Sequence, residues 1–174
     1  MSLTSYAAPR SLDEALRALG ELGDAATVVA GGQDVVPLMN QGRLAPSHLL
    51  DISRLAPLAS VTSTGGRGGT LRIGSLVTHA ALARDPAVRE AVPLLAEAAE
   101  QIGGGLQVRN RGTIGGAAAA ANPAYDLPAC LAALDAVCIL GSLRETRRVP
   151  ARSFFLGAGR TARRANELLL GFDI

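Results

Sequence analysis

The chain has 174 residues, of which 48% are hydrophobic and 18% are charged, and its formal net charge at pH 7 is +2. This length is enough for one domain or two small subdomains with a buried core. No apolar run is long enough to cross a bilayer and the N-terminus lacks a secretory signal, so we expect a cytoplasmic protein without membrane insertion. With no Trp and few Tyr or Phe, the chain lacks the stacking aromatics typical of nucleic-acid binding.

The side chains indicate no catalytic machinery of their own. Cys130 and Cys138 are eight residues apart in apolar sequence, a spacing that suits neither a metal site nor a disulfide framework. There is no Ser-His-Asp set and no pair of catalytic carboxylates, and we interpret His79 as a satisfied structural histidine. The arginines near the C-terminus are interpreted as a solvated or partner-facing surface. They are Arg144, Arg147, Arg148, Arg152, Arg160, Arg163 and Arg164.

The first part of the chain alternates helical and strand patterns. Ser11 and Glu14 form a capping box before an apolar periodicity that predicts an amphipathic helix. Short β-branched or aliphatic runs predict buried strands, and Asp34 is placed to cap the helix after the first of them. Because each crossover carries a helix, we expect a parallel β-α-β-α-β unit. The expected elements are a helix from 11 to about 23, a strand at 26–30, a helix at 34–41 and a strand at 48–52.

After Pro57 the pattern changes to that of an antiparallel sheet with helices. Two strand-like segments, 58–63 and 70–74, flank the glycine-rich turn 65–69, as in a hairpin. We therefore expect an α+β fold of two subdomains, a small one at residues 1–55 and a larger one at 56–174. The further elements expected are helices at 78–82, 87–102 (bent near Pro93) and 126–134, and strands at 136–140 and 167–174.

Two glycine pairs are the features that most directly indicate a ligand. Gly31-Gly32 follows a strand, and Gly115-Gly116 ends a second segment that we interpret as a loop. Adjacent glycines let the backbone approach a ligand and turn its N–H groups toward an anion. Thr113 adds a hydroxyl, and Asp126 supplies an acceptor for ribose hydroxyls. These residues predict a site for a phosphorylated cofactor; simple turns, and for Asp126 a helix cap, are the alternatives.

Seven short motifs follow one another along the chain. They are VAGGQDVVPL at 29–38, IGSLVTHA at 73–80, QVRNRGTIGG at 107–116, DLP at 126–128, ALDA at 133–136, FFLG at 154–157 and ELLL at 167–170. Each motif is weak alone. In this order and spacing, over nearly all of the chain, they resemble the FAD-binding domain of the medium, flavin-carrying subunit of molybdenum hydroxylases. That family includes carbon monoxide dehydrogenase and xanthine dehydrogenase.

The resemblance implies that FAD lies between the two subdomains, with its diphosphate against both glycine segments, Asp126 near the sugar and Leu169 near the adenine. It also implies two partner subunits, a small one with [2Fe-2S] clusters and a large one with the molybdenum cofactor. Electrons would pass from the clusters through FAD to an external acceptor. The implied cofactor-binding residues are Val29, Ala30, Gly31, Gly32, Gln33, Asp34, Val35, Thr113, Gly115, Gly116, Ala117, Asp126 and Leu169.

Some features differ from the family pattern. Ala117 stands where Asn is usual and Ala120 where His is frequent. Loss of the Asn amide is worth on the order of 1 kcal/mol, so looser flavin binding is expected. Family subunits continue into a C-terminal domain, whereas this chain stops at Ile174. Two alternatives stay open: a shortened, non-catalytic homologue that acts as an assembly or interaction module, and a binder of another nucleotide.

Overall fold

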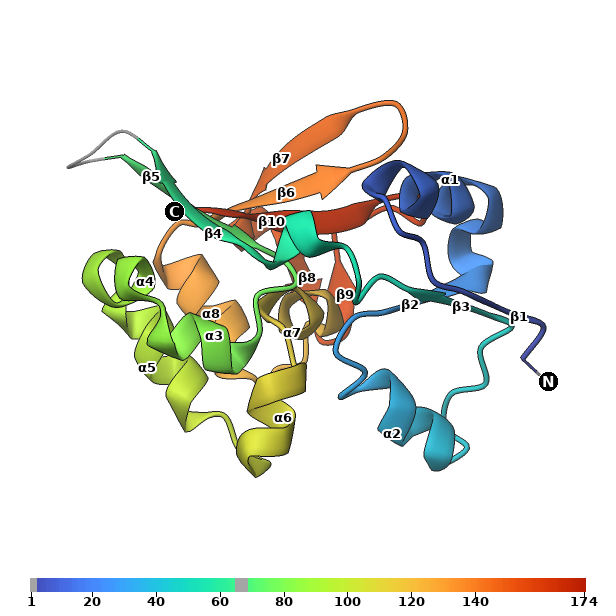
Figure 1. The fold of residues 1–174 in the computed structure, drawn as a ribbon, viewed down its shortest axis with the longest axis horizontal. Helices are drawn as coiled ribbons and strands as arrows, with labels where there is room; N and C mark the ends of the chain where they lie inside the picture. Colours follow the sequence, from blue (N-terminus) through green and yellow to red (C-terminus); the bar gives the residue numbers. More distant parts are fainter. Residues whose placement is uncertain (1–2, 65–68) are drawn as a thin grey trace.

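The computed structural model describes residues 3–64 and 69–174 and contains two main sheets with helices around them (Figure 1). The N-terminal unit is a three-stranded parallel sheet in the order β1-β3-β2. Its elements are β1 (Ser5–Ala7), α1 (Leu12–Leu22), β2 (Ala26–Val29), α2 (Val35–Asn40) and β3 (His48–Asp51). The predicted parallel β-α-β-α-β unit is confirmed, although the sequence pattern did not locate the three-residue strand β1.

The start of helix α1 agrees in part with the capping box that its sequence predicts. The Ser11 hydroxyl accepts a hydrogen bond from the Glu14 N–H at 3.2 Å. The Glu14 carboxylate accepts one from the Arg10 N–H at 2.8 Å, one residue before the cap, so only one half of the predicted capping box forms. The apolar face of the helix buries Ala15, Leu16 and Leu19 in a cluster that includes β3 and the start of the C-terminal strand.

The larger unit is built on a five-stranded antiparallel sheet in the order β4-β5-β10-β6-β7. Its strands are β4 (Val61–Thr64), β5 (Thr70–Gly74), β6 (Val137–Gly141), β7 (Thr146–Pro150) and β10 (Leu168–Asp173). The last strand lies in the middle of the sheet and joins the hairpin β4–β5 to the hairpin β6–β7. The predicted strand at 58–63 begins too early, because Pro57 starts a 3-10 turn at Ala56–Ala59. Of the predicted turn, residues 65–68 lie outside the described residues.

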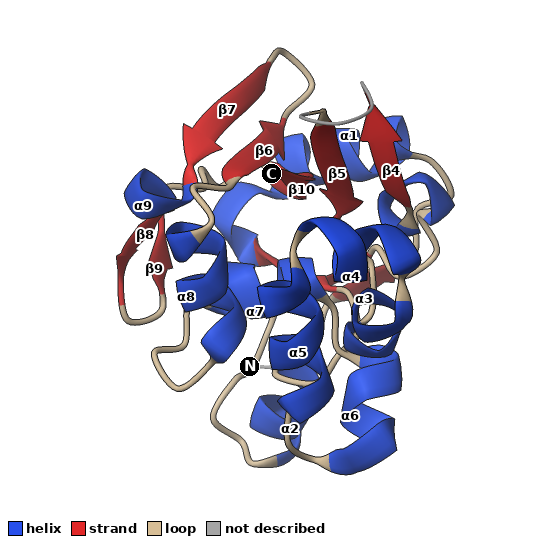
Figure 2. Cartoon of the chain, turned by 90° about the vertical axis from the view of Figure 1, so that its left-hand side faces the viewer, coloured by secondary structure: helices blue, strands red, loops and turns tan. Residues whose placement is uncertain are grey.

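Helices α3 to α8 gather on one side of this sheet (Figure 2). They are α3 (His79–Arg84), α4 (Pro86–Ala91), α5 (Pro93–Gln101), α6 (Gly105–Arg111), α7 (Ile114–Ala120) and α8 (Asp126–Ala133). All of these helices except α6 enclose the larger hydrophobic core together with Phe172 of β10 and Phe154. The segment 87–102, predicted as one bent helix, is two helices that meet at Val92, since Pro93 has no N–H and restricts the residue before it.

One prediction for this region is wrong. The motif at 107–116 is not a glycine loop, because its residues form most of α6 and the start of α7, joined at Gly112 and Thr113. The chain after α8 adds the short helix α9 (Ala151–Phe154) and the two-stranded ribbon of β8 (Phe155–Gly157) and β9 (Arg160–Thr161). Among the described residues, none of the helices has the length and apolar character needed to span a membrane.

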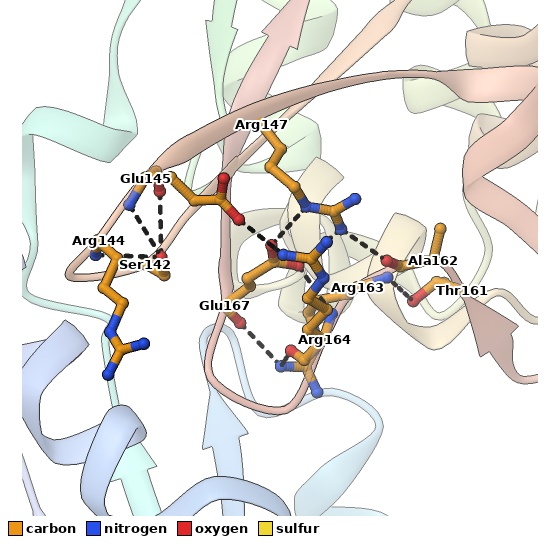
Figure 3. Close-up of polar contacts among 9 residues, drawn as sticks. All are labelled: Ser142, Arg144, Glu145, Arg147, Thr161, Ala162, Arg163, Arg164 and Glu167. Atoms are coloured by element: carbon orange, nitrogen blue, oxygen red, sulfur yellow. Dashed lines mark hydrogen bonds and ion pairs between the residues drawn. The ribbon is translucent and has the colours of Figure 1, made fainter.

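A buried carboxylate ties the segment before β10 to strand β7 (Figure 3). Glu167 is 1% exposed and accepts two hydrogen bonds from the Arg147 guanidinium, at 2.6 and 2.9 Å. It also accepts one from the Arg164 N–H at 2.8 Å, and Arg163 donates to the Glu167 carbonyl at 2.8 Å. Burial alone would raise the pKa of Glu167, but the hydrogen bonds and charges of Arg147 and Arg164 lower it overall. The interpretation of the arginine cluster as a solvated surface is therefore wrong for Arg147.

We expect Glu167→Gln to destabilise the protein by about 3 kcal/mol, because the substitution leaves the Arg147 guanidinium largely buried without its charged partner. Urea denaturation followed by far-UV circular dichroism measures the change. The matched control is Glu145→Gln, which removes an exposed ion pair with Arg164 and should change the free energy of unfolding little. Equal effects of the two substitutions would contradict a structural role for the buried carboxylate.

Candidate functional site

A cavity of about 240 Å³ lies between the N-terminal unit and the larger unit. One wall comes from the loop after β2 and the segment after β3, and the other from the end of β5 and the junction of α6 and α7. The lining residues are Ala30, Gly31, Ser53, Leu76, Thr78, Asn110, Arg111 and Thr113. The cavity therefore joins the two predicted glycine segments at the interface between the two units.

The two segments meet through their main chains. A Cβ built on Gly31 would fall deep inside the van der Waals radius of the Arg111 carbonyl oxygen. Any other residue at this position would push the loop after β2 away from the end of α6. Gly31 is thus required for contact between the units, and the contact fixes one edge of the cavity.

The loop after β2 has open backbone donors. In the described part of the chain, no hydrogen bond is donated by the N–H groups of residues 31–35. Gly32 has a φ of +74°, a conformation that favours glycine and turns successive N–H groups toward one side of a loop. Gly31 lines the cavity, and residues 31–35 are all half-buried, so the unpaired amides of this loop make it suited to an anion.

The second segment is different, because the amide groups of residues 114–117 are already paired. The N–H groups of Ile114 and Gly115 donate to the carbonyl oxygens of Val77 and Ser75 at 3.0 and 2.9 Å. Those of Gly116 and Ala117 donate to the side chain and the carbonyl of Thr113, both at 3.0 Å. This segment therefore offers an anion the hydroxyl of Thr113, which lines the cavity, rather than the amide groups that we expected.

Packing explains why residue 115 is glycine and why residue 117 is alanine. A Cβ on Gly115 would lie 2.5 Å from both the Cβ and the carbonyl oxygen of Ser75, so glycine is needed where α7 crosses the end of β5. Ala117, where the family pattern has Asn, is 8% exposed and packs in the larger core. Leu169 lies in the same core, 6% exposed, and does not line the cavity.

Neither of two acidic side chains caps a helix, the role predicted for Asp34 and the alternative considered for Asp126. Asp34 precedes α2 but makes no side-chain cap bond; its carboxylate accepts a hydrogen bond from the Tyr125 hydroxyl of the larger unit instead. Asp126 is the first residue of α8, the cap position belongs to Tyr125, and the helix has no side-chain cap bond. Asp126 is exposed and lines a separate groove of about 500 Å³ beside α5, away from the cavity.

Several cavity residues were not predicted as site residues, and for Arg111 a phosphate or partner contact and an anchor of its loop were equally favoured. Asn110, Arg111 and Thr78 lie within two of the sequence motifs, so their position in the motifs was a signal that could have found them. Ser53 carried no such signal, because only the pairing of β2 with β3 brings it to the cavity. Arg109 lies on the same helix, but its guanidinium donates to the Ile102 carbonyl at 2.9 Å and so holds α6 in place.

His79 lies beside the cavity at the start of α3. It is 6% exposed, its N–H donates to the Gly112 carbonyl at 3.0 Å, and its Nδ1 has no hydrogen-bond partner among the described residues. Burial lowers the pKa of the imidazole to about 4, against a smaller opposing effect of the Asp34 charge. The interpretation of His79 as a satisfied histidine is therefore wrong, and the ring is neutral near pH 7.

The sequence matches a family model over residues 2–174, described as the FAD binding domain in molybdopterin dehydrogenase. It is 41% identical over 165 residues to the carbon monoxide dehydrogenase medium chain of Hydrogenophaga pseudoflava, covering 95% of this chain and 56% of that one. It is 40% identical over 171 residues to the glyceraldehyde dehydrogenase medium chain of Sulfolobus acidocaldarius, covering 98% and 59%. These matches confirm the resemblance that the motifs indicated.

Solved structures give the same result. The carbon monoxide dehydrogenase of Hydrogenophaga pseudoflava that lacks the Mo-pyranopterin moiety of its cofactor contains a chain that superposes with a TM-score of 0.93 at 39% identity. The match covers 99% of this chain and 58% of that one. Quinoline 2-oxidoreductase from Pseudomonas putida 86 gives a TM-score of 0.91 at 32% identity, with coverage of 100% and 59%. The chain thus spans somewhat less than two thirds of the relatives that it matches.

The buried imidazole of His79 predicts that the protein loses stability as the pH falls from about 6.5 to about 4. In this range the unfolded chain binds a proton that the folded protein does not, so acid favours unfolding. Urea midpoints measured across this range should fall for the wild type and fall less steeply for His79→Gln. His48→Gln removes the chain's other histidine and should keep the wild-type slope. An unchanged slope in His79→Gln would contradict the assignment.

Proposed function

The chain belongs to the family of FAD-binding domains of molybdopterin dehydrogenases, and from that premise we propose that the cavity between its two units receives the diphosphate of FAD. The observation that carries the proposal is the row of unpaired N–H groups at residues 31–35. A diphosphate needs several donors and little side-chain bulk near it. This loop supplies both, beside a cavity and without a Rossmann glycine motif.

Each predicted site residue has a place in this proposal. Val29 and Ala30 carry the chain from β2 into the loop, and Gly31 to Val35 present their amides to the diphosphate. Thr113 donates its hydroxyl from the opposite wall, while Gly115, Gly116 and Ala117 fix its position through the start of α7. We keep Asp126 as the contact to the sugar from the exposed start of α8. Leu169 acts through packing in the core that also holds Ala117.

When bound, FAD supplies the redox chemistry of an oxidoreductase component. In the described part of the chain no group of three or more His, Cys, Asp or Glu side chains is placed to hold a metal ion. The task of this chain is to bind and orient flavin. Both of the relatives described above are named medium chains, which supports a place in a complex of several subunits. We assign the [2Fe-2S] clusters to a small partner, the molybdenum cofactor to a large one, and a cytoplasmic location to the whole.

In this arrangement the chain links the iron-sulfur partner to an external electron acceptor. Cys130 and Cys138 take no part in it, because both are buried free thiols whose pKa burial raises, that of Cys138 to about 12. Neutral, buried thiols are poor nucleophiles and poor metal ligands. The electron-transfer path therefore depends on where flavin is held, which the loop at residues 31–35 controls.

We expect Gly32→Ala to weaken FAD binding by about tenfold or more, because a Cβ at a φ of +74° strains the loop and moves its amides off the diphosphate. The dissociation constant follows from the quenching of flavin fluorescence on titration with apoprotein. Gly42→Ala is the matched control: its φ is +68°, so the backbone strain is similar, but its Cβ meets open space. That variant should keep the wild-type affinity.

The same titration separates the alternatives. FMN and riboflavin lack the diphosphate bridge and should bind more weakly than FAD if the loop holds that bridge. A wild-type protein that remains colourless after incubation with FAD would overturn the proposal and favour a non-catalytic module. Release of a different nucleotide from the denatured protein would favour the other alternative, a protein that binds another nucleotide.

A further inference from the structure

Tyr125 connects the larger unit to the loop that carries the open amides. Its hydroxyl donates a hydrogen bond to the Asp34 carboxylate, across 91 positions of the sequence. Its ring is half-buried and packs against the larger core. The turn before it is fixed by the Asn122 side chain, which accepts from the Ala124 N–H at 3.0 Å, and by the Asn122 carbonyl, which accepts from the Tyr125 N–H at 3.0 Å. The hydroxyl is thus presented from a rigid support.

Asp34 needs this partner because its own helix gives it none. An Asp before a helix usually accepts from the second or third helical N–H. Here the second, that of Val36, already donates to the Gly32 carbonyl at 3.1 Å, and the third residue is Pro37, which has no N–H. The amides of residues 31–35, in the same loop as Asp34, are open donors.

A carboxylate that folded back on those amides would do two things. It would occupy donors that the proposed site needs, and it would place a negative charge where a diphosphate has to bind. The hydrogen bond to Tyr125 turns the carboxylate away from its own loop and toward the larger unit. Burial, with the Asp34 bond and charge, raises the pKa of Tyr125, so its hydroxyl stays protonated and keeps donating near neutral pH.

We propose that Tyr125 is a positioning residue for the anion site: its hydroxyl holds the Asp34 carboxylate off the open amides of residues 31–35 and so keeps them free for the diphosphate. The inference rests on the proposed function but goes beyond it. It assigns a role to a residue outside both glycine segments, and it makes Asp34 a potential competitor of the ligand. This competition distinguishes the idea from a simple latch between the two units.

The test compares FAD affinity in Tyr125→Phe, Asp34→Ala and the double variant. Tyr125→Phe should weaken FAD binding by about five- to tenfold, because the freed carboxylate then competes for the amides. Adding Asp34→Ala removes the competitor, so the double variant should bind FAD more tightly than Tyr125→Phe alone. Inorganic pyrophosphate probes the amides without the flavin. It should likewise bind more weakly to Tyr125→Phe than to the wild type, and more tightly to the double variant than to Tyr125→Phe.

The chain's other tyrosine provides the control. Tyr6 donates from β1 to the Asp51 carboxylate at 2.6 Å, so Tyr6→Phe removes a bond of the same chemistry and should leave FAD affinity unchanged. Circular dichroism and thermal midpoints of the apoproteins confirm that each variant is folded.

The inference is overturned if Tyr125→Phe binds FAD like the wild type. It is also overturned if the double variant is as weak as Tyr125→Phe, since a plain latch gives that result. Wild-type affinity in Tyr125→Phe would leave the proposed function standing, whereas a wild-type protein that binds no FAD would remove the proposed function itself.

Discussion

The architecture of the candidate site depends on one contact between main chains. Gly31 lies against the carbonyl of Arg111, at a separation that leaves no space for a Cβ. Because no side chain intervenes, the loop after β2 and the junction of α6 with α7 stand at a distance that the backbones alone determine. The cavity lies next to this contact, and every residue that lines it comes from one side of the contact or the other. A change in this contact would therefore change the whole site.

The two sides of the cavity offer an anion different hydrogen-bond donors. The loop of the small unit offers unpaired N–H groups, whereas the amides at the start of α7 are paired with Ser75, Val77 and Thr113. An anion bound there would meet main-chain dipoles on one side and the Thr113 hydroxyl on the other, where Arg111 also lines the cavity, with no need for a cluster of cationic side chains. This division agrees with a chain whose net charge is only +2, and in which Arg147 and Arg163 hydrogen-bond within the protein.

Local patterns predicted much of the fold. The periodicity that begins at Ser11 gave the first helix, and the alternation of helices and strands gave the parallel sheet, because both signals are encoded within a few neighbouring residues. Asp34 and Glu167 were out of reach, since their partners Tyr125 and Arg147 are distant in sequence and are brought near only by tertiary packing. A local pattern can show that a carboxylate is available for a cap, but it cannot show that another residue binds it first.

The glycines show why the site was only partly predictable. In the sequence Gly31-Gly32 and Gly115-Gly116 look alike, yet each position has a different physical cause. Gly31 permits a backbone contact, Gly32 permits a positive φ, and Gly115 permits a helix to cross the end of β5. A glycine pair indicates an anion site only when its N–H groups stay unpaired, and that depends on the carbonyls placed beside it. In the second pair the Gly115 N–H donates to the Ser75 carbonyl, just after β5, and the Gly116 N–H donates to the Thr113 hydroxyl. The same Thr-Ile-Gly-Gly sequence that indicated a phosphate loop thus forms the closed start of a helix, and the open donors lie across the cavity.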